Sequence, residues 1–358
     1  METPALAAIV RRYLETAGPL ATWTDLTSVT AAEELRIEPV TGGFSGASVY
    51  RVRHASGEFA LRRWPMSLPH VARIAELHRW LAWMSRHGIP VAVPCQTATG
   101  QALVDHAGDL YQLEPWLPGA PQLSTEPTAA RLRAVMELLA RMHRVSADYR
   151  PLPAGRDWFD CRTGPSPTVR RRWQLLRSWT DDRVELTGAA ISLAPGSVLR
   201  ELAREALSLR NRHHAAVAAA LAEHVELELP LLPVMRDVWT AHVLFDGDRV
   251  SGLIDPAAAQ TETIVTDLSR LVSTLPTVDS VEIAAAIAAY EGRRPMQAAE
   301  HRLLPVLHDS GLLLSGLTWV ERFAAGDVHE SSPLVAERLE IIVRRLREGP
   351  THSSWFQI

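Results

Sequence analysis

The sequence predicts an α+β protein in two parts, a small antiparallel sheet and a larger, mainly helical region. Short apolar runs separated by turn residues fill positions 37–64 and 102–117, which is typical of strands. Apolar residues at helical spacing dominate after Pro118-Gly119. Within the helical part, two apolar runs flank Asp246-Gly247-Asp248, and glycine accepts the positive φ that a hairpin turn needs. At 358 residues the chain is long for one domain and suits two parts.

Residues 1–117 are predicted to form the small part. Gly88-Ile89-Pro90 ends its second helix, and Pro118-Gly119 marks its boundary, because proline and glycine interrupt regular structure. The expected elements are a helix at 3–16, strands around 49–52 and 59–61 joined by a turn at Ser56-Gly57, a helix at 69–87, and strands at 102–106 and 109–117.

Residues 118–358 are predicted to form the larger part. It includes a helical insert at about 150–230, which is interrupted near Ala194-Pro195-Gly196. Apolar periodicity predicts helices at 127–144, over most of 166–224, and at 279–291, 298–324 and 332–348.

Composition narrows the class of protein. Apolar residues make up 47% of the chain and the net charge is −4, so neither a nucleic-acid nor a membrane partner is expected. No run of 18 apolar residues predicts a membrane span, and the first twenty residues lack the pattern of a signal peptide. The two cysteines suit neither a disulfide framework nor a zinc site, which favours a reducing, cytoplasmic setting. The chain has no lysine, so all 37 residues in the Lys and Arg count are arginine.

The stretch MRDVWTAHVLFDGDRVSGLID at 235–255 has the residues of a phosphotransferase centre. Asp237 is followed five residues later by His242, and the predicted hairpin would bring Asp255 back near Asp237. Two converging carboxylates can position a hydroxyl nucleophile and a metal-bound phosphate together.

This stretch resembles the catalytic core of the aminoglycoside phosphotransferase family, which shares the two-lobed protein-kinase-like fold. In that family a His-Gly-Asp loop is followed by Asn five residues after the Asp, then by a hairpin and an Ile-Asp pair. The resemblance makes Asp237 the catalytic carboxylate and Asp255 a metal ligand, with His242 at the Asn position. Asp267 resembles the family's Asp that steadies the catalytic loop. The chain departs from the pattern at Met235-Arg236, where His-Gly would stand.

The chemistry of His242 leaves two roles open. Mg²⁺ prefers oxygen ligands, whereas imidazole suits softer divalent metals, so a metal-bound His242 would weaken Mg²⁺ or favour Mn²⁺. Alternatively, the ring only hydrogen-bonds to the Asp237 loop, as Asn also can.

The resemblance extends to a kinase small lobe that binds nucleotide. Phe59-Ala60-Leu61-Arg62 resembles the Val-Ala-Ile-Lys strand, which places Arg62 at the lysine position, or Arg63 if the register shifts by one. Glu76 is the only acid in 66–88 and is the expected partner of Arg62. Glycines let backbone N–H groups approach phosphate oxygens, and the candidate phosphate loop consists of Gly42, Gly43, Phe44, Ser45 and Gly46.

Residues Glu114-Pro115-Trp116-Leu117 would connect the two lobes. In kinases this hinge reads the adenine edge through a backbone C=O and N–H. Because Pro115 has no N–H, we expect the C=O of Glu114 and the N–H of Trp116 to take these roles.

These residues predict transfer of the γ-phosphate of ATP or GTP, bound with Mg²⁺ or Mn²⁺, to a hydroxyl of a small molecule. The alternative is a catalytically weak pseudokinase that binds nucleotide or a partner. Substitutions at Arg62, Met235 and His242 favour this alternative, and retention of Asp237 and Asp255 opposes it. Aminoglycosides are polycations and would need an acidic pocket. The sequence shows no dense acid cluster, so modification of these drugs is not expected.

Overall fold

The computed structural model describes residues 3–14, 35–40, 48–64, 71–193, 196–275 and 280–349. The candidate phosphate loop at 42–46 lies outside these residues. The chain divides into two compact units. The N-terminal unit comprises Met1–Gly119, Pro151–Phe159 and Ser251–Ile254, and the C-terminal unit comprises Ala120–Arg150, Asp160–Val250 and Asp255–Ile358. Each unit is described by itself.

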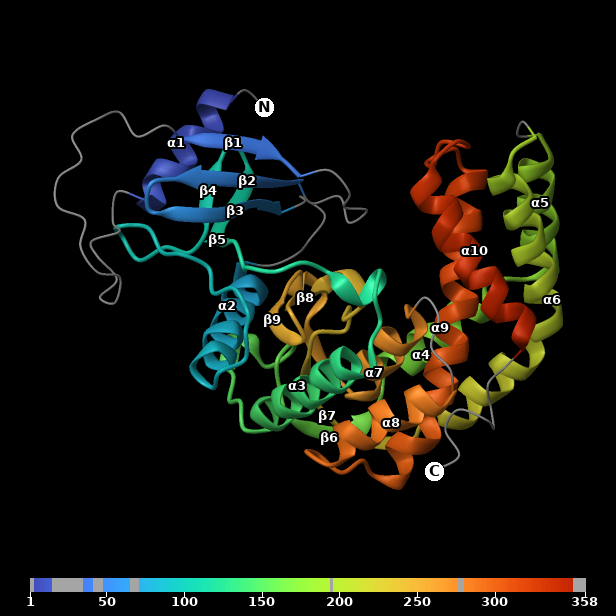
Figure 1. Cartoon of the computed structure of the whole chain (residues 1–358). Helices are drawn as coiled ribbons and strands as arrows, with labels where there is room; N and C mark the ends of the chain where they lie inside the picture. Colours follow the sequence, from blue (N-terminus) through green and yellow to red (C-terminus); the bar gives the residue numbers. More distant parts are fainter. Residues whose placement is uncertain are drawn as a thin grey trace. The chain divides into compact units, whose positions relative to one another are not determined.

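The N-terminal unit is built on a five-stranded antiparallel sheet with strand order β1-β2-β3-β5-β4 (Figure 1). The predicted helices and strands are confirmed in type, with small shifts at their ends. The elements are α1 (Thr3–Leu14), β1 (Arg36–Pro39), β2 (Ser48–His54), β3 (Gly57–Trp64), α2 (Val71–Arg86), β4 (Val104–His106) and β5 (Asp109–Pro115).

The two faces of this sheet differ in chemistry because side chains alternate along each strand. On one face, apolar residues of α1, among them Ile9 and Val10, pack with Leu61 and Leu113 into an apolar core. The other face carries buried polar residues and lies toward α2, whose His78 Nε2 is 2.9 Å from Gln112 Oε1. Arg62 sits directly opposite Gln112 and therefore belongs to this polar face.

The C-terminal unit combines a three-stranded antiparallel sheet, order β10-β7-β6, with a separate hairpin and a set of helices. The strands are β6 (Arg162–Pro165), β7 (Glu228–Val234) and β10 (Gln260–Glu262). The hairpin is β8 (Val243–Asp246) and β9 (Arg249–Leu253), of which residues 251–253 are counted with the N-terminal unit. The helices are α3 (Ala129–Ala147), α4 (Pro167–Arg177), α5 (Asp181–Leu193), α6 (Val198–His224), α7 (Val265–Ser273), α8 (Ser280–Glu291), α9 (Ala298–Ala324) and α10 (Pro333–Glu348). Short 3-10 turns occupy Gln122–Ser124, Pro153–Gly155, Thr240–His242 and Pro256–Ala258.

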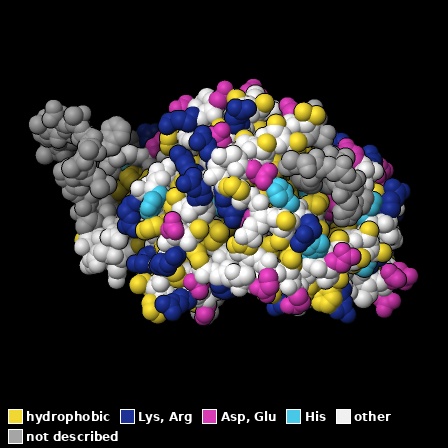
Figure 2. All heavy atoms as spheres, turned by 90° about the horizontal axis from the view of Figure 1, so that it is seen from below, with side chains coloured by type: hydrophobic (Ala, Val, Ile, Leu, Met, Phe, Trp, Pro, Cys, Tyr) yellow, Lys and Arg dark blue, Asp and Glu magenta, His cyan; other side chains and the backbone are white. Residues whose placement is uncertain are grey.

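Helix α9 is the central helix of this unit and packs against α6, α7 and α10 (Figure 1). By length and composition it could cross a membrane, whereas no membrane span was predicted from the sequence. However, 72% of its most apolar window is buried inside the protein, as in the core helix of a water-soluble protein. On the face shown in Figure 2, arginine and acidic side chains both occur among apolar ones.

Two buried histidines, His143 and His308, and the half-buried His78 are expected to make the stability of the protein depend on pH. Burial lowers the pKa of His78, His143 and His308, although each ring also has a hydrogen-bonding partner that acts in the opposite direction. The unfolded chain therefore takes up protons below about pH 6.5 that the folded chain does not bind. The neutral histidines therefore contribute to the free energy of unfolding above about pH 6.5, and this contribution is lost as the pH falls.

We predict that the free energy of unfolding falls between pH 7 and 5.5, by up to about 1.4 kcal/mol per pH unit for each of these imidazoles. Urea unfolding at several pH values measures the fall. The variant His78→Gln keeps a polar group opposite Gln112 but removes one titration, so its slope should be smaller. A free energy that is constant over this range would contradict the prediction.

Candidate active site

The fold brings Asp237 and Asp255 to neighbouring positions in the C-terminal unit. Strand β7 ends at Val234, which pairs with Gln260 at the start of β10, so the segments after β7 and before β10 begin side by side. The β8–β9 hairpin lies between them in sequence, and Gly247 at its turn has a φ of 61°. The predicted hairpin and the predicted convergence of the two carboxylates are both observed.

His242 lies between the two carboxylates. Its Nδ1 is 2.8 Å from the backbone oxygen of Asp237, and its Nε2 is 3.8 Å from Asp255 Oδ2. A carbonyl oxygen can only accept, so Nδ1 carries the proton of this bond, and in the neutral ring Nε2 presents its lone pair. The two roles considered for His242 are thus compatible, because one nitrogen supports the Asp237 loop while the other faces Asp255.

The His242 and Asp255 side chains fit a divalent cation. The 3.8 Å between Nε2 and Oδ2 lies within the span that two metal–ligand bonds of about 2.1 Å can bridge. Asp255 has left-handed backbone angles, φ 55° and ψ 62°, which cost a non-glycine residue about 1–3 kcal/mol and tend to occur at functional sites. Among the described residues, no group of three or more His, Cys, Asp and Glu side chains gathers for a metal. Phosphate oxygens and water would complete the coordination, as is usual for Mg²⁺.

Asp267 anchors the loop that carries Asp237. Its fully buried carboxylate accepts the backbone N–H of Met235 at 3.1 Å and that of Arg236 at 2.6 Å. The third donor is His143, whose Nε2 is 3.1 Å from Asp267 Oδ2 and whose Nδ1 is 2.8 Å from the Tyr290 hydroxyl. The predicted loop-steadying role of Asp267 is confirmed by these bonds. Met235, at the family's histidine position, has a buried side chain and keeps its N–H in the network.

Arg270 contacts the candidate catalytic carboxylate, and the sequence analysis did not identify it. Its Nε donates to Asp237 Oδ1 at 2.9 Å. Arg270 follows Asp267 by three residues on α7, and residues three apart share one face of a helix. The signal was therefore present, because a charged residue three positions after Asp267 in an amphipathic helix faces the same loop as Asp267.

In the N-terminal unit, the structure distinguishes Arg62 from Arg63. Arg62 is 6% exposed on the polar face of the sheet, and its guanidinium lies 3.9 Å from Glu114 Oε1. Arg63 points to the opposite face, where it pairs with Asp109 at 3.4 Å. The neighbouring Gln112 donates to Glu114 at 2.6 Å and so helps to hold the Glu114 carboxylate. The arginine on the polar face is thus Arg62, with a carboxylate on the adjacent strand.

Glu76 has a clear structural task in the N-terminal unit. Its buried carboxylate accepts the backbone N–H of Leu152 at 3.2 Å and lies 3.5 Å from Arg79 Nε. A Cβ atom on Gly155 would lie 2.3 Å from the Glu76 side chain, so this segment approaches α2 closely. Glu76 therefore ties residues 151–159 to α2. The Arg62–Glu76 pair stays a prediction.

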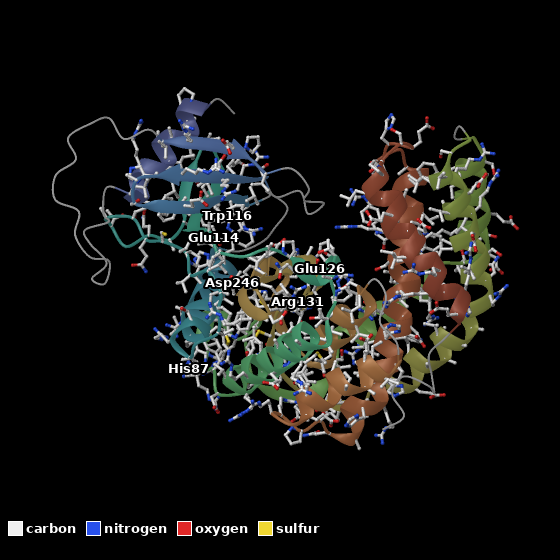
Figure 3. All side chains as sticks on the ribbon, in the orientation of Figure 1. His87, Glu114, Trp116, Glu126, Arg131 and Asp246 are labelled. Atoms are coloured by element: carbon white, nitrogen blue, oxygen red, sulfur yellow. The ribbon has the colours of Figure 1, made fainter. Side chains whose placement is uncertain are left out.

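The predicted adenine-reading groups require a correction. Glu114 and Trp116 lie near one another at the end of β5 (Figure 3), and the Trp116 N–H donates to the Glu58 carbonyl at 3.0 Å. Bonded and non-bonded pairs alternate in an antiparallel ladder, so Glu114 likewise directs its backbone groups toward Ala60 on β3. The prediction for Trp116 is wrong, because its N–H already belongs to the sheet.

The same alternation of bonded and non-bonded pairs identifies the backbone groups at the end of β5 that point away from β3. Pro115 pairs with Phe59 at a non-bonded position, which also explains why a residue without an N–H is tolerated there. The C=O of Pro115 and the N–H of Leu117 are therefore directed away from β3.

The Asp267 anchor can be tested by Asp267→Asn. The amide cannot accept all three donors, so at least one buried N–H loses its partner, at a cost of about 1–3 kcal/mol. We expect a lower free energy of unfolding in urea denaturation. Asp246→Asn, at the exposed hairpin turn of the same unit, is the control and should change stability by no more than about 0.5 kcal/mol. Equal effects of the two changes would contradict the anchor.

Comparison with known proteins identifies the family. A family model described as the phosphotransferase enzyme family (APH) matches residues 36–306. Homoserine kinase from Methylobacterium radiotolerans is 29% identical over 229 residues, which is 63% of this chain and 61% of that protein, so the chain spans about three fifths of this relative. Homoserine kinase from Pseudomonas aeruginosa PAO1 is 27% identical over 257 residues, covering 67% of this chain and 68% of that protein.

Solved structures agree in fold. An amicoumacin kinase in complex with AMP-PNP and Ca²⁺ has a TM-score of 0.62 at 14% identity, covering 87% of this chain and 89% of its own. A spectinomycin phosphotransferase in complex with ADP and spectinomycin has a TM-score of 0.61 at 12% identity, covering 87% and 92%. A microcompartment-associated aminopropanol kinase has a TM-score of 0.58 at 16% identity, covering 98% and 99%. The predicted protein-kinase-like fold is confirmed, and because the family model matches roughly three quarters of its residues, the chain belongs to the phosphotransferase enzyme family.

Proposed function

We propose that this protein transfers the γ-phosphate of ATP to a hydroxyl of a small molecule, with a divalent cation. The observation that carries the proposal is the arrangement of Asp237, His242 and Asp255 on one stretch of chain, held by the buried Asp267. Membership of the phosphotransferase family and the kinases among its relatives support it. The second candidate is a nucleotide-binding module without turnover, favoured by arginine at the lysine position and histidine at the asparagine position.

Asp237 orients the acceptor. Arg270 holds Oδ1, which leaves Oδ2 as the oxygen that receives the acceptor hydroxyl. In the transfer the hydroxyl oxygen bonds to the γ-phosphorus, the bond from that phosphorus to the β–γ bridging oxygen breaks, and the proton passes to Asp237. Such a reaction needs positioning and charge neutralisation more than a strong base, so an ordinary carboxylate suffices.

Asp255 and His242 would hold the cation through one oxygen and one nitrogen. When bound, a divalent cation neutralises charge on the β- and γ-phosphate oxygens. The imidazole nitrogen shifts the preference of this donor set away from Mg²⁺ and toward Mn²⁺.

Arg62 and the end of β5 would bind the nucleotide. The guanidinium neutralises phosphate charge, and Glu114 orients it. The Pro115 C=O and the Leu117 N–H suit the N6 donor and N1 acceptor of adenine, which favours ATP. Guanine has an acceptor, O6, where adenine has its N6 donor, and a donor, N1–H, where adenine has its N1 acceptor, so it would not match these two backbone groups.

The first test is Asp237→Asn. Transfer to an acceptor should fall by about 10²-fold or more, because the hydroxyl loses both its orienting group and its proton acceptor. Coupled detection of ADP measures turnover, and titration calorimetry measures ATP affinity, which should stay within about twofold. The exposed Asp246→Asn is the control. Equal loss of ATP affinity and turnover would show that Asp237 acts in nucleotide binding instead.

The second test is His242→Asn. An amide oxygen is a harder ligand than imidazole, so activity and nucleotide binding with Mg²⁺ should rise relative to those with Mn²⁺. Thermal unfolding with ATP or GTP, each without metal, with Mg²⁺ and with Mn²⁺, reports binding without turnover, because a ligand of the folded state raises the midpoint. An unchanged metal preference would place His242 outside the metal site. No shift for wild-type protein with any nucleotide would reject the nucleotide site.

A further inference from the structure

Arginine and tryptophan side chains gather beside Asp237 in the C-terminal unit. This arginine–tryptophan cluster consists of Trp239 on the catalytic segment, Arg270 on α7, Trp319 on α9 and Arg338 on α10. Three of the four residues come from helices that follow the catalytic segment in the sequence. The cluster therefore exists only once these helices have packed.

Trp239 connects the cluster to the catalytic residues. The Arg338 guanidinium carbon lies 4.5 Å from the centroid of Trp239 and 5.9 Å from that of Trp319. The Arg270 guanidinium carbon lies 6.0 Å from the same Trp239 centroid, while its Nε bonds Asp237. The Trp239 and His242 rings meet edge-on with centroids 5.0 Å apart. Arg270 thus contacts Asp237 directly, and Trp239, Arg338 and Trp319 continue the cluster from it.

The charges in this cluster favour an anion. Arg338 is half-buried; burial lowers its pKa, the positive charge of Arg270 lowers it further, and the carboxylates of Asp237 and Glu337 raise it. Arg338 therefore lies within the field of both Arg270 and Asp237. Asp237 is one anion close to the guanidinium groups of Arg270 and Arg338. A bound anion between these two groups would further reduce their mutual repulsion, whereas a bound ammonium group would add to it.

Guanidinium and indole each select part of an acceptor. The planar fork of arginine matches a carboxylate through two parallel hydrogen bonds, which a neutral group cannot replace. Indole faces hold an apolar carbon chain and at the same time stabilise the guanidinium groups above them.

We propose that the arginine–tryptophan cluster is the acceptor subsite and that it selects a small hydroxyl compound bearing a carboxylate. Arg338 binds the carboxylate, Trp239 and Trp319 hold the carbon chain, and the hydroxyl is directed to Asp237. The proposal rests on the proposed function and narrows its acceptor to hydroxy acids and hydroxy amino acids, in contrast to polycationic acceptors.

The experiment compares acceptors that differ only in the carboxylate. Wild-type protein is assayed for ADP release with ATP and Mg²⁺ or Mn²⁺, using L-homoserine against homoserinol, glycerate against glycerol, and an aminoglycoside. We expect kcat/KM for at least one carboxylate compound to exceed that for its neutral partner by about tenfold to hundredfold, the range expected of a charged hydrogen-bonded pair. The aminoglycoside should be the poorest acceptor.

Arg338→Gln and Arg338→Lys locate the preference. Arg338→Gln should raise KM for the carboxylate compound about tenfold or more, with KM for ATP and for the neutral partner within about twofold. Arg338→Lys keeps the charge without the fork, so it should recover only part of the preference. Arg344→Gln, at an exposed arginine of the same helix, is the matched control and should leave the preference unchanged.

Other results of the acceptor comparison and of Arg338→Gln would either overturn or support the proposed subsite. An increase in KM for ATP in Arg338→Gln would assign the cluster to the γ-phosphate and overturn the proposal. Equal kcat/KM for charged and neutral partners in every pair would overturn it as well. If no compound is phosphorylated, titration calorimetry with ADP and metal decides. Tighter binding of a carboxylate compound that depends on Arg338 would support the subsite while the proposed transfer fails, and equal binding of both partners would reject the subsite.

Discussion

The buried carboxylate of Asp267 is the interaction on which the candidate active site depends. It accepts two consecutive backbone N–H groups of the loop before Asp237 and a third donor from His143. A carboxylate buried in a low-dielectric interior is stable only when its oxygens are hydrogen-bonded, so the loop, the histidine and the aspartate specify one another's positions. Helix α7 then extends this support, since Arg270 on the same face reaches Asp237 itself.

Three residues differ in type from the family pattern, yet each still makes a contact that holds its segment in place. His242 keeps a hydrogen bond to the Asp237 loop through Nδ1 and directs a second nitrogen at Asp255. Met235 is buried and still gives its N–H to Asp267. Arg62 has a carboxylate, Glu114, on the neighbouring strand. These contacts keep the Asp237 loop and Arg62 in place although their side chains differ from the family pattern.

The sequence predicted the positions of helices and strands better than the direction of the backbone N–H of Trp116. Helices and strands with clear periodicity, such as β3 and α9, matched their predicted positions because each pattern is complete within one segment. The direction of a backbone N–H is different, because it depends on how two strands are paired. Trp116 gives its N–H to Glu58 only because β3 and β5 pair in one register, and the sequence near the hinge contains no sign of that register.

The sequence by itself determined the order and spacing of Asp237, His242 and Asp255, since a hairpin with glycine at its turn is a local structure. The place of Asp267 near the start of α7 was implied only by the family resemblance, because no helix was predicted at 265–273. Only the tertiary structure decided that His143, 124 residues away, would complete the Asp267 anchor, and that Arg338 and Trp319 would meet Trp239. Such contacts arise when distant helices bury their apolar faces against one another, and apolar periodicity tells which face is buried but not which partner covers it.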